Sequence, residues 1–135
     1  MLLDTAYVQA LLNRRDQYHS RARALLPIVR EAAEVWVTEA VLVEVGNAMS
    51  VFDRMAAARF ISQCYQTPNM RVVSVDTSLV LRALELYRNR SDKSWGLTDC
   101  ISFVVMAERD LTAAVTSDIH FQQAGYRTLL AENDL

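Results

Sequence analysis

Short β-type runs alternate with helical stretches along almost the whole chain, and this alternation restricts its fold more than any other feature. Residues 35–38, 70–75 and 112–116 are β-type runs, and the segments between them carry apolar residues at helical spacing. Two shorter strands are expected at residues 2–4 and 126–130. Because a helix between two strands joins them in parallel, this order predicts an α/β fold: a mainly parallel sheet with helices on both faces.

The expected helices follow from apolar spacing and from capping residues. They span residues 5–12, 16–31, 39–51, 54–65, 77–87 and 97–109, with a single helical turn at 121–124. Their candidate N-caps are Asp16, Thr38, Asp53, and Asp76 or Thr77. Pro27 predicts a kink or a break in the second helix. Phe52 is expected to extend the apolar face of the third.

The helix over residues 97–109 is apolar on nearly all of its sides, which is typical of a buried helix. Asp99 lies in its first turn and therefore next to the expected core. A carboxylate in such a place needs a hydrogen-bonding or positive partner. The unpaired N–H groups at the start of the helix provide one such partner.

The composition is that of a folded protein in which broad nucleic-acid binding is not expected. At 135 residues and 52% hydrophobic residues, one domain over residues 1–135 is expected. A net charge of −2 argues against nonspecific binding to nucleic acid, although a local basic path stays open. Thirteen of the fourteen basic residues are arginines, which can grip phosphate in a bidentate manner.

Neither the cysteines nor the histidines form a recognisable metal motif. Cys64 and Cys100 lie in apolar helical patterns and are expected to be buried free thiols, while His19 and His120 are far apart in sequence. The chain has no membrane-length apolar window, and its start lacks the features of a signal peptide. We therefore expect a cytoplasmic location.

Four acids lie at the ends of the expected strands or at helix starts. Asp4 follows the first strand, Asp118 follows the strand at residues 112–116, and Asp99 opens the buried helix. Glu44 lies one and a half turns into the helix at 39–51, on the flank expected to face the sheet. Functional groups of open parallel sheets gather at the carboxyl ends of the strands. Converging carboxylates repel one another unless they share a hard cation such as Mg²⁺ or Mn²⁺. A purely structural capping role for each acid stays the alternative.

Several short segments, taken in order, resemble the PIN-domain ribonucleases, and most closely the VapC-type toxins of bacterial and archaeal toxin–antitoxin pairs. The resemblance covers residues 2 to about 130. Its carriers are residues 2–5, 16–22, 38–47, 95–100, and 115–121 with the following Ala-Gly125-Tyr. It implies a three-layer PIN-like fold with short strands.

The resemblance also implies a set of site residues. The quartet that would hold Mg²⁺ or Mn²⁺ is Asp4, Glu44, Asp99 and Asp118. Thr116 or Ser117 would orient a water or a carboxylate ligand. Three alternatives stay open, namely Glu39 in place of Glu44, Asp92 as an additional acid or a solvated residue, and Asn47 as a support for Glu44 or a plain surface residue.

The activity implied by the resemblance is metal-assisted hydrolysis of RNA phosphodiester bonds, in which the cation activates water and offsets charge on the phosphate. The implied partners are RNA, a cognate antitoxin protein and a second copy of the chain in a homodimer. Candidates for gripping the RNA backbone are Arg14, Arg15, Arg21, Arg23, Arg88, Arg90 and Lys93.

Three other functions compete with this one. A PIN nuclease of RNA maturation or decay would have the same site without an antitoxin. A catalytically inactive PIN-like module would bind a nucleotide or a protein, but the three glycines form no phosphate-binding loop. An interaction protein could use the helix at residues 54–65 as a dimer surface.

Overall fold

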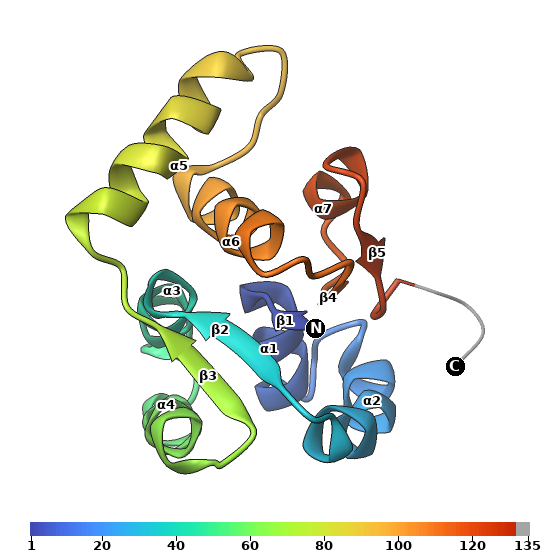
Figure 1. Cartoon of the computed structure of the whole chain (residues 1–135). Helices are drawn as coiled ribbons and strands as arrows, with labels where there is room; N and C mark the ends of the chain where they lie inside the picture. Colours follow the sequence, from blue (N-terminus) through green and yellow to red (C-terminus); the bar gives the residue numbers. More distant parts are fainter. Residues whose placement is uncertain (132–135) are drawn as a thin grey trace.

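The computed structural model, which describes residues 1–131, contains a five-stranded parallel sheet with helices on both faces (Figure 1). The strand order is β3-β2-β1-β4-β5. The strands are β1 (Leu2–Leu3), β2 (Val35–Thr38), β3 (Met70–Val73), β4 (Ala113–Val115) and β5 (Arg127–Thr128). The helices are α1 (Thr5–Leu12), α2 (His19–Glu31), α3 (Glu39–Met49), α4 (Arg54–Gln66), α5 (Thr77–Asn89), α6 (Leu97–Glu108) and α7 (Ile119–Gln123). The predicted three-layer α/β fold is confirmed.

Alternation of side chains along the central strands divides the core into two layers. Leu2 of β1 packs with residues of α5, α6 and α7, whereas Leu3 packs with residues of α1 to α4. On β4, Ala114 and Val115 alternate in the same way. In Figure 1, α5 to α7 accordingly lie above the sheet, and α2 and α4 lie below it. The shortness of β1 therefore does not prevent it from contributing to both layers.

The strand order changes direction at β1, and this change defines the candidate site. From β1 the chain moves to β2 and β3 on one side, and it then returns to place β4 and β5 on the other. The carboxyl ends of β1 and β4 therefore flank a topological switch point, where open α/β sheets bind ligands. Asp4 and Thr116 directly follow these two strands.

Several sequence predictions about the elements are confirmed. The side chains of Thr38, Asp53 and Asp76 accept hydrogen bonds from the first turns of α3, α4 and α5. Both cysteines are buried and free. No helix within residues 1–131 is long and apolar enough to cross a bilayer.

Three predictions about helix limits are wrong. Pro27 does not break α2, which runs through it; the proline is exposed, so water can reach this side of the helix. Asp16 bonds the N–H of Tyr18 at 2.8 Å in a local turn, so α2 begins later, at His19. Phe52 is 71% exposed because α3 already ends at Met49, whose carbonyl accepts from the N–H groups of Phe52 and Asp53.

Candidate active site

Asp4 is a buried carboxylate at the carboxyl end of β1. Its N–H donates to the carbonyl of Val115 (3.3 Å), which extends the β1–β4 pairing, and its carbonyl accepts from the first turn of α1. The residue is only 4% exposed, and its Oδ2 accepts a hydrogen bond from the Thr116 hydroxyl at 2.8 Å.

Burial raises the pKa of Asp4 from 3.8 to about 6. Hydrogen bonds from Thr116 and from the Thr5 backbone lower this pKa, while the charges of Asp99 and Asp118 raise it further. The electrostatic environment of Asp4 thus includes two of the other acids that the sequence singled out.

Thr116 links the acids that follow β1 and β4. Its fully buried hydroxyl donates to Asp4 and accepts from the N–H of Asp118 at 3.0 Å. The Asp118 carboxylate in turn accepts from the N–H of His120 at 2.9 Å and caps α7. Of the two residues considered for an orienting role, Thr116 makes these contacts, whereas the Ser117 side chain is partly exposed and forms no hydrogen bond within residues 1–131.

Asp99 reaches the same place from the first turn of α6. Its Oδ2 accepts from the N–H of Gly96 at 3.1 Å and lies 2.9 Å from His120 Nδ1. Burial raises the pKa of Asp99, and the hydrogen bond from His120 lowers it. The same imidazole nitrogen lies 3.5 Å from Asp118 Oδ1, so His120 stands between two of the acids.

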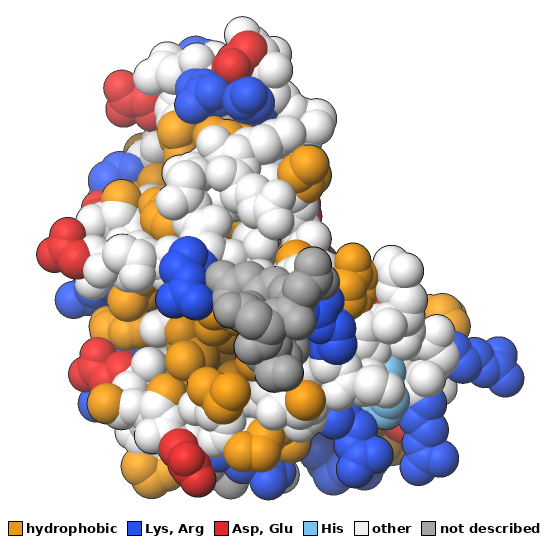
Figure 2. All heavy atoms as spheres, turned by 90° about the vertical axis from the view of Figure 1, so that its right-hand side faces the viewer, with side chains coloured by type: hydrophobic (Ala, Val, Ile, Leu, Met, Phe, Trp, Pro, Cys, Tyr) orange, Lys and Arg blue, Asp and Glu red, His pale blue; other side chains and the backbone are white. Residues whose placement is uncertain are grey.

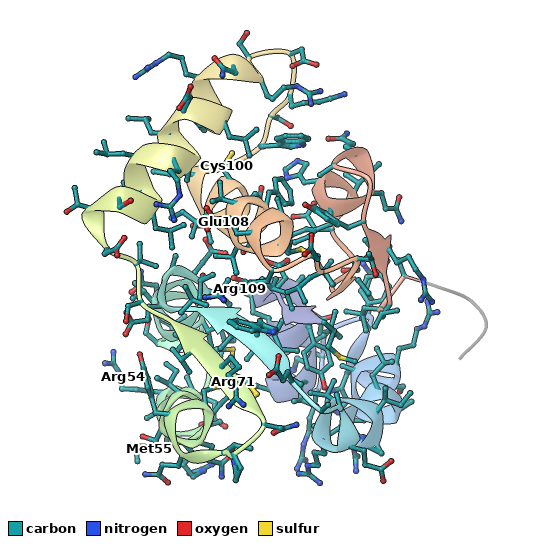
Figure 3. All side chains as sticks on the ribbon, in the orientation of Figure 1. Arg54, Met55, Arg71, Cys100, Glu108 and Arg109 are labelled. Atoms are coloured by element: carbon teal, nitrogen blue, oxygen red, sulfur yellow. The ribbon has the colours of Figure 1, made fainter. Side chains whose placement is uncertain are left out.

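The two ends of α6 are both fixed, which sets the position of Asp99. Cys100, directly after Asp99, is fully buried against the upper core layer. At the other end Arg109 reaches from α6 over β2, with its guanidinium 4.9 Å from the centroid of the Trp36 ring (Figure 3). A rotation of α6 that moved Asp99 away from the site would therefore expose Cys100 or break the contact between Arg109 and Trp36.

The donor atoms of this cluster are suited to a divalent cation. One ligand atom each from Asp99, Asp118 and His120 lies within 4.8 Å of the others. The charged neighbours that shift the pKa of Asp4 are Asp99 and Asp118, so negative charge accumulates at the carboxyl ends of β1 and β4. A hard cation offsets such charge and prefers carboxylate oxygens, so the residues fit Mg²⁺ or Mn²⁺.

The sequence comparison decides the family. Residues 1–125 match the profile of the PIN domain. This chain belongs to the PIN-domain family. Among solved structures it is similar to the VapC20 toxin of Mycobacterium tuberculosis, described as cleaving the sarcin-ricin loop, with a TM-score of 0.83 and 24% sequence identity. The match covers 93% of this chain and 95% of that one. Among curated proteins, no sequence matches.

The fourth predicted acid of the PIN domain, Glu44, lies apart from these contacts. It is exposed on α3 and forms no hydrogen bond or ion pair within residues 1–131, so the expectation that it faces the sheet is wrong. Val41 and Val45 occupy the buried face of α3, and Glu44 falls at its solvent edge. Asn47, one turn further along, is also exposed. The structure therefore brings Asp99 and Asp118 together and links Asp4 to Asp118 through Thr116, whereas Glu44 makes none of these contacts.

Two alternative acids have other partners. Glu39 accepts a hydrogen bond of 2.6 Å from the Tyr65 hydroxyl and one of 3.3 Å from the N–H of Val75, and it thereby joins α3 to α4 and to the segment after β3. Asp92 is exposed and forms a two-pronged pair with Arg90, at 3.0 and 3.1 Å. Neither carboxylate forms a hydrogen bond or an ion pair with Asp4, Asp99, Asp118 or His120 within the described residues.

The basic candidates divide into two groups. Arg90 stacks over the Trp95 ring at 4.9 Å while it binds Asp92, close to the start of α6. Arg14 and Arg15 are exposed in the turn between α1 and α2. Figure 2 shows Lys and Arg side chains gathered along the lower edge of the face that it presents.

His120 is the residue that sequence reasoning missed. Neither histidine belongs to a zinc motif, although His120 stands only two residues after Asp118. That short spacing was the available signal, because a residue that follows a capping acid so closely can turn back toward its carboxylate.

Proposed function

We propose that this PIN domain is a metal-dependent endoribonuclease and the toxin of a toxin–antitoxin pair. Two observations support the proposal: donor atoms of Asp99, Asp118 and His120 lie within 4.8 Å of one another, and the Thr116 hydroxyl links Asp4 to the N–H of Asp118. The likeness to VapC20 supports RNA as the substrate class and an antitoxin protein as a partner. A homodimer, a cytoplasmic location and a single domain over residues 1–135 stay predictions; residues 132–135 lie outside the described part.

Asp4, Asp99 and Asp118 are the residues that would hold Mg²⁺ or Mn²⁺, with Glu44 facing solvent on α3 as the fourth acid. When bound, the cation supplies an activated water and offsets charge on the scissile phosphate. The hydrogen bond from Thr116 holds Oδ2 of Asp4 in a fixed orientation, and the other carboxylate oxygen is then available to bind the cation. Burial of Asp4 strengthens its attraction to a cation, because few water molecules screen the charge there.

RNA cleavage in vitro tests the proposal. The purified protein is expected to cleave structured RNA in the presence of Mg²⁺ or Mn²⁺, and excess EDTA should abolish this cleavage. In cells, expression of the protein alone should arrest growth. Asp99→Asn should be inactive in both assays. Glu85→Gln, an exposed charge change on α5, is the matched control and should retain wild-type activity. Cleavage that persists in EDTA, or in a folded Asp99→Asn protein, contradicts the metal mechanism.

Glu44 and Glu39 make opposite predictions. If Glu44 is the fourth acid of the proposed cation site, Glu44→Gln removes a carboxylate charge from that site and should reduce cleavage about 100-fold. Stability should be unchanged, because the side chain is exposed and has no partner within the described chain. Glu39→Gln should retain cleavage but lower the free energy of unfolding by about 1 kcal/mol, because its hydrogen bonds to Tyr65 and Val75 are weakened. Cleavage rates and urea unfolding curves of both variants check this. The reverse pattern would make Glu39 the fourth acid.

A further inference from the structure

The ring of His120 is held between the carboxylates of the candidate site. Its Nδ1 lies 2.9 Å from Asp99 Oδ2 and 3.5 Å from Asp118 Oδ1. Its side chain is 24% exposed, and the Asp99 side chain is 15% exposed. A contact of 2.9 Å between a ring nitrogen and a carboxylate oxygen contains a shared proton. A cation bound at this point would replace that proton.

These separations suit donors on one metal ion. Two donors that each lie about 2.1 Å from a cation are about 3.0 Å apart at an octahedral angle and about 3.4 Å apart at a tetrahedral one. The two N···O separations in the structure, 2.9 and 3.5 Å, are close to these values. The nitrogen can therefore share one ion with either carboxylate oxygen, and since all three atoms lie within 4.8 Å of one another, a small movement of the carboxylates would bring them onto the same ion.

The second ring nitrogen has a partner of its own, which fixes the ring. Nε2 lies 3.3 Å from the Ser94 hydroxyl. The backbone N–H of His120 is bound by Asp118, and the adjacent Phe121 is fully buried. Histidines that bind metals almost always donate the N–H of their other nitrogen to a hydrogen-bond acceptor, and this bond sets both the tautomer and the direction of the lone pair. Once a cation takes the place of the Nδ1 proton, Nε2–H can donate to the Ser94 hydroxyl, and the lone pair of Nδ1 then faces the ion and the carboxylates.

We infer that His120 Nδ1 is a nitrogen ligand of the bound cation and that it shifts the preference of the site from Mg²⁺ toward Mn²⁺. The inference rests on the proposed function, since it concerns the same cation. Mg²⁺ is hard, retains its waters and favours oxygen, whereas transition metals accept imidazole more readily. Ser94 is a positioning residue in this arrangement, because it acts on the cation only through the imidazole.

Electron paramagnetic resonance of Mn²⁺ bound to the full chain tests the inference. Pulsed spectra of the wild-type protein should show nitrogen coupling from a directly bonded imidazole. This coupling should be absent in His120→Asn and retained in His19→Asn, whose ring bonds the carbonyl of Ala10 away from the acids. Since these two are the only histidines of the chain, the source of the coupling is unambiguous. The wild-type spectrum needs no variant and stands even if a substitution impairs folding.

Affinities give the second readout. His120→Asn should weaken Mn²⁺ binding at least 10-fold and Mg²⁺ binding at most about threefold, so that the Mn²⁺/Mg²⁺ affinity ratio falls. Ser94→Ala should weaken Mn²⁺ binding about 10-fold while the nitrogen coupling persists. Mn²⁺ that binds without nitrogen coupling and with an unchanged affinity ratio in His120→Asn overturns the inference alone. Failure of the wild type to bind either ion overturns the proposed function as well.

Discussion

The substitution Asp4→Asn is expected to have two effects. It should stabilise the cation-free protein, measured in EDTA, and it should abolish RNA cleavage in the presence of Mg²⁺ or Mn²⁺. In the folded chain burial raises the pKa of Asp4 from 3.8 to about 6, so the folded state favours the neutral acid. Protonation of Asp4 therefore stabilises the folded state. This contribution is complete below 3.8, the pKa of Asp4 in the unfolded chain, and it is lost as the pH rises through about 6, its pKa in the folded chain. A shift of this size corresponds to about 3 kcal/mol, which sets the largest gain expected from a neutral side chain at pH 8.

Urea unfolding in EDTA measures this effect. Asp4→Asn should exceed the wild type by about 2 kcal/mol at pH 8, and the gap should close near pH 4, where Asp4 is protonated in the wild-type protein. Addition of Mn²⁺ should raise the melting temperature of the wild type and not that of Asp4→Asn, because only a protein that binds the ion gains stability from it. Glu85→Gln should behave as the wild type in both buffers. An Asp4→Asn protein that is less stable at pH 8, or that still responds to Mn²⁺, contradicts the role assigned to Asp4.

Thr116→Val is expected to lower both stability and cation affinity. Valine has the shape of threonine but lacks the hydroxyl that donates to Asp4 and accepts from Asp118. The buried Asp4 carboxylate and the part-buried N–H of Asp118 would each lose a hydrogen-bond partner, which should lower the free energy of unfolding by about 2 kcal/mol. Because the orientation of Asp4 is lost, Mn²⁺ affinity should fall between about 10- and 100-fold. Urea unfolding and Mn²⁺ titration measure the two effects.

The chain offers a matched control for this substitution. Thr5 is also buried, but its hydroxyl has no hydrogen-bond partner within the described residues. Thr5→Val should therefore leave affinity unchanged and stability equal or slightly higher. Thr116→Ser, which keeps the hydroxyl, should retain affinity within about threefold. If Thr116→Val and Thr5→Val behave alike, the Thr116 hydroxyl does not orient the acids.

The fold could be predicted from the sequence because its local signals agree with one another. Thr38 and Asp53 lie where a strand or turn meets an apolar helix, and both act as caps in the structure. Pro27 misled because proline is costly only where the lost hydrogen bond stays unsatisfied or its ring clashes, and here it lies on the exposed side of α2. Phe52 misled because apolar spacing continues past the point where α3 ends.

The site was only partly predictable from the sequence. The place of each residue along the chain could be predicted, but the rotation of a helix about its own axis, which directs its side chains, could not. Asp4, Asp99 and Asp118 follow from strand ends and helix starts, which the chain order fixes. Glu44 depends on the rotation of α3, which its packing against α1 and α4 decides, and neither helix signals that rotation in the sequence. The ring of His120 is directed by a five-residue helix and by contacts with Asp99 and Ser94, both more than twenty residues away.

The proposed mechanism requires one divalent cation that is shared by Asp4, Asp99 and Asp118. Anomalous diffraction from crystals grown or soaked with Mn²⁺ tests it most directly, because the signal locates the ion without reference to activity. We expect a manganese peak within about 2.3 Å of an oxygen from each of these three carboxylates. An ordered wild-type site with no peak there at saturating Mn²⁺, or a peak bound elsewhere on the chain, would contradict it.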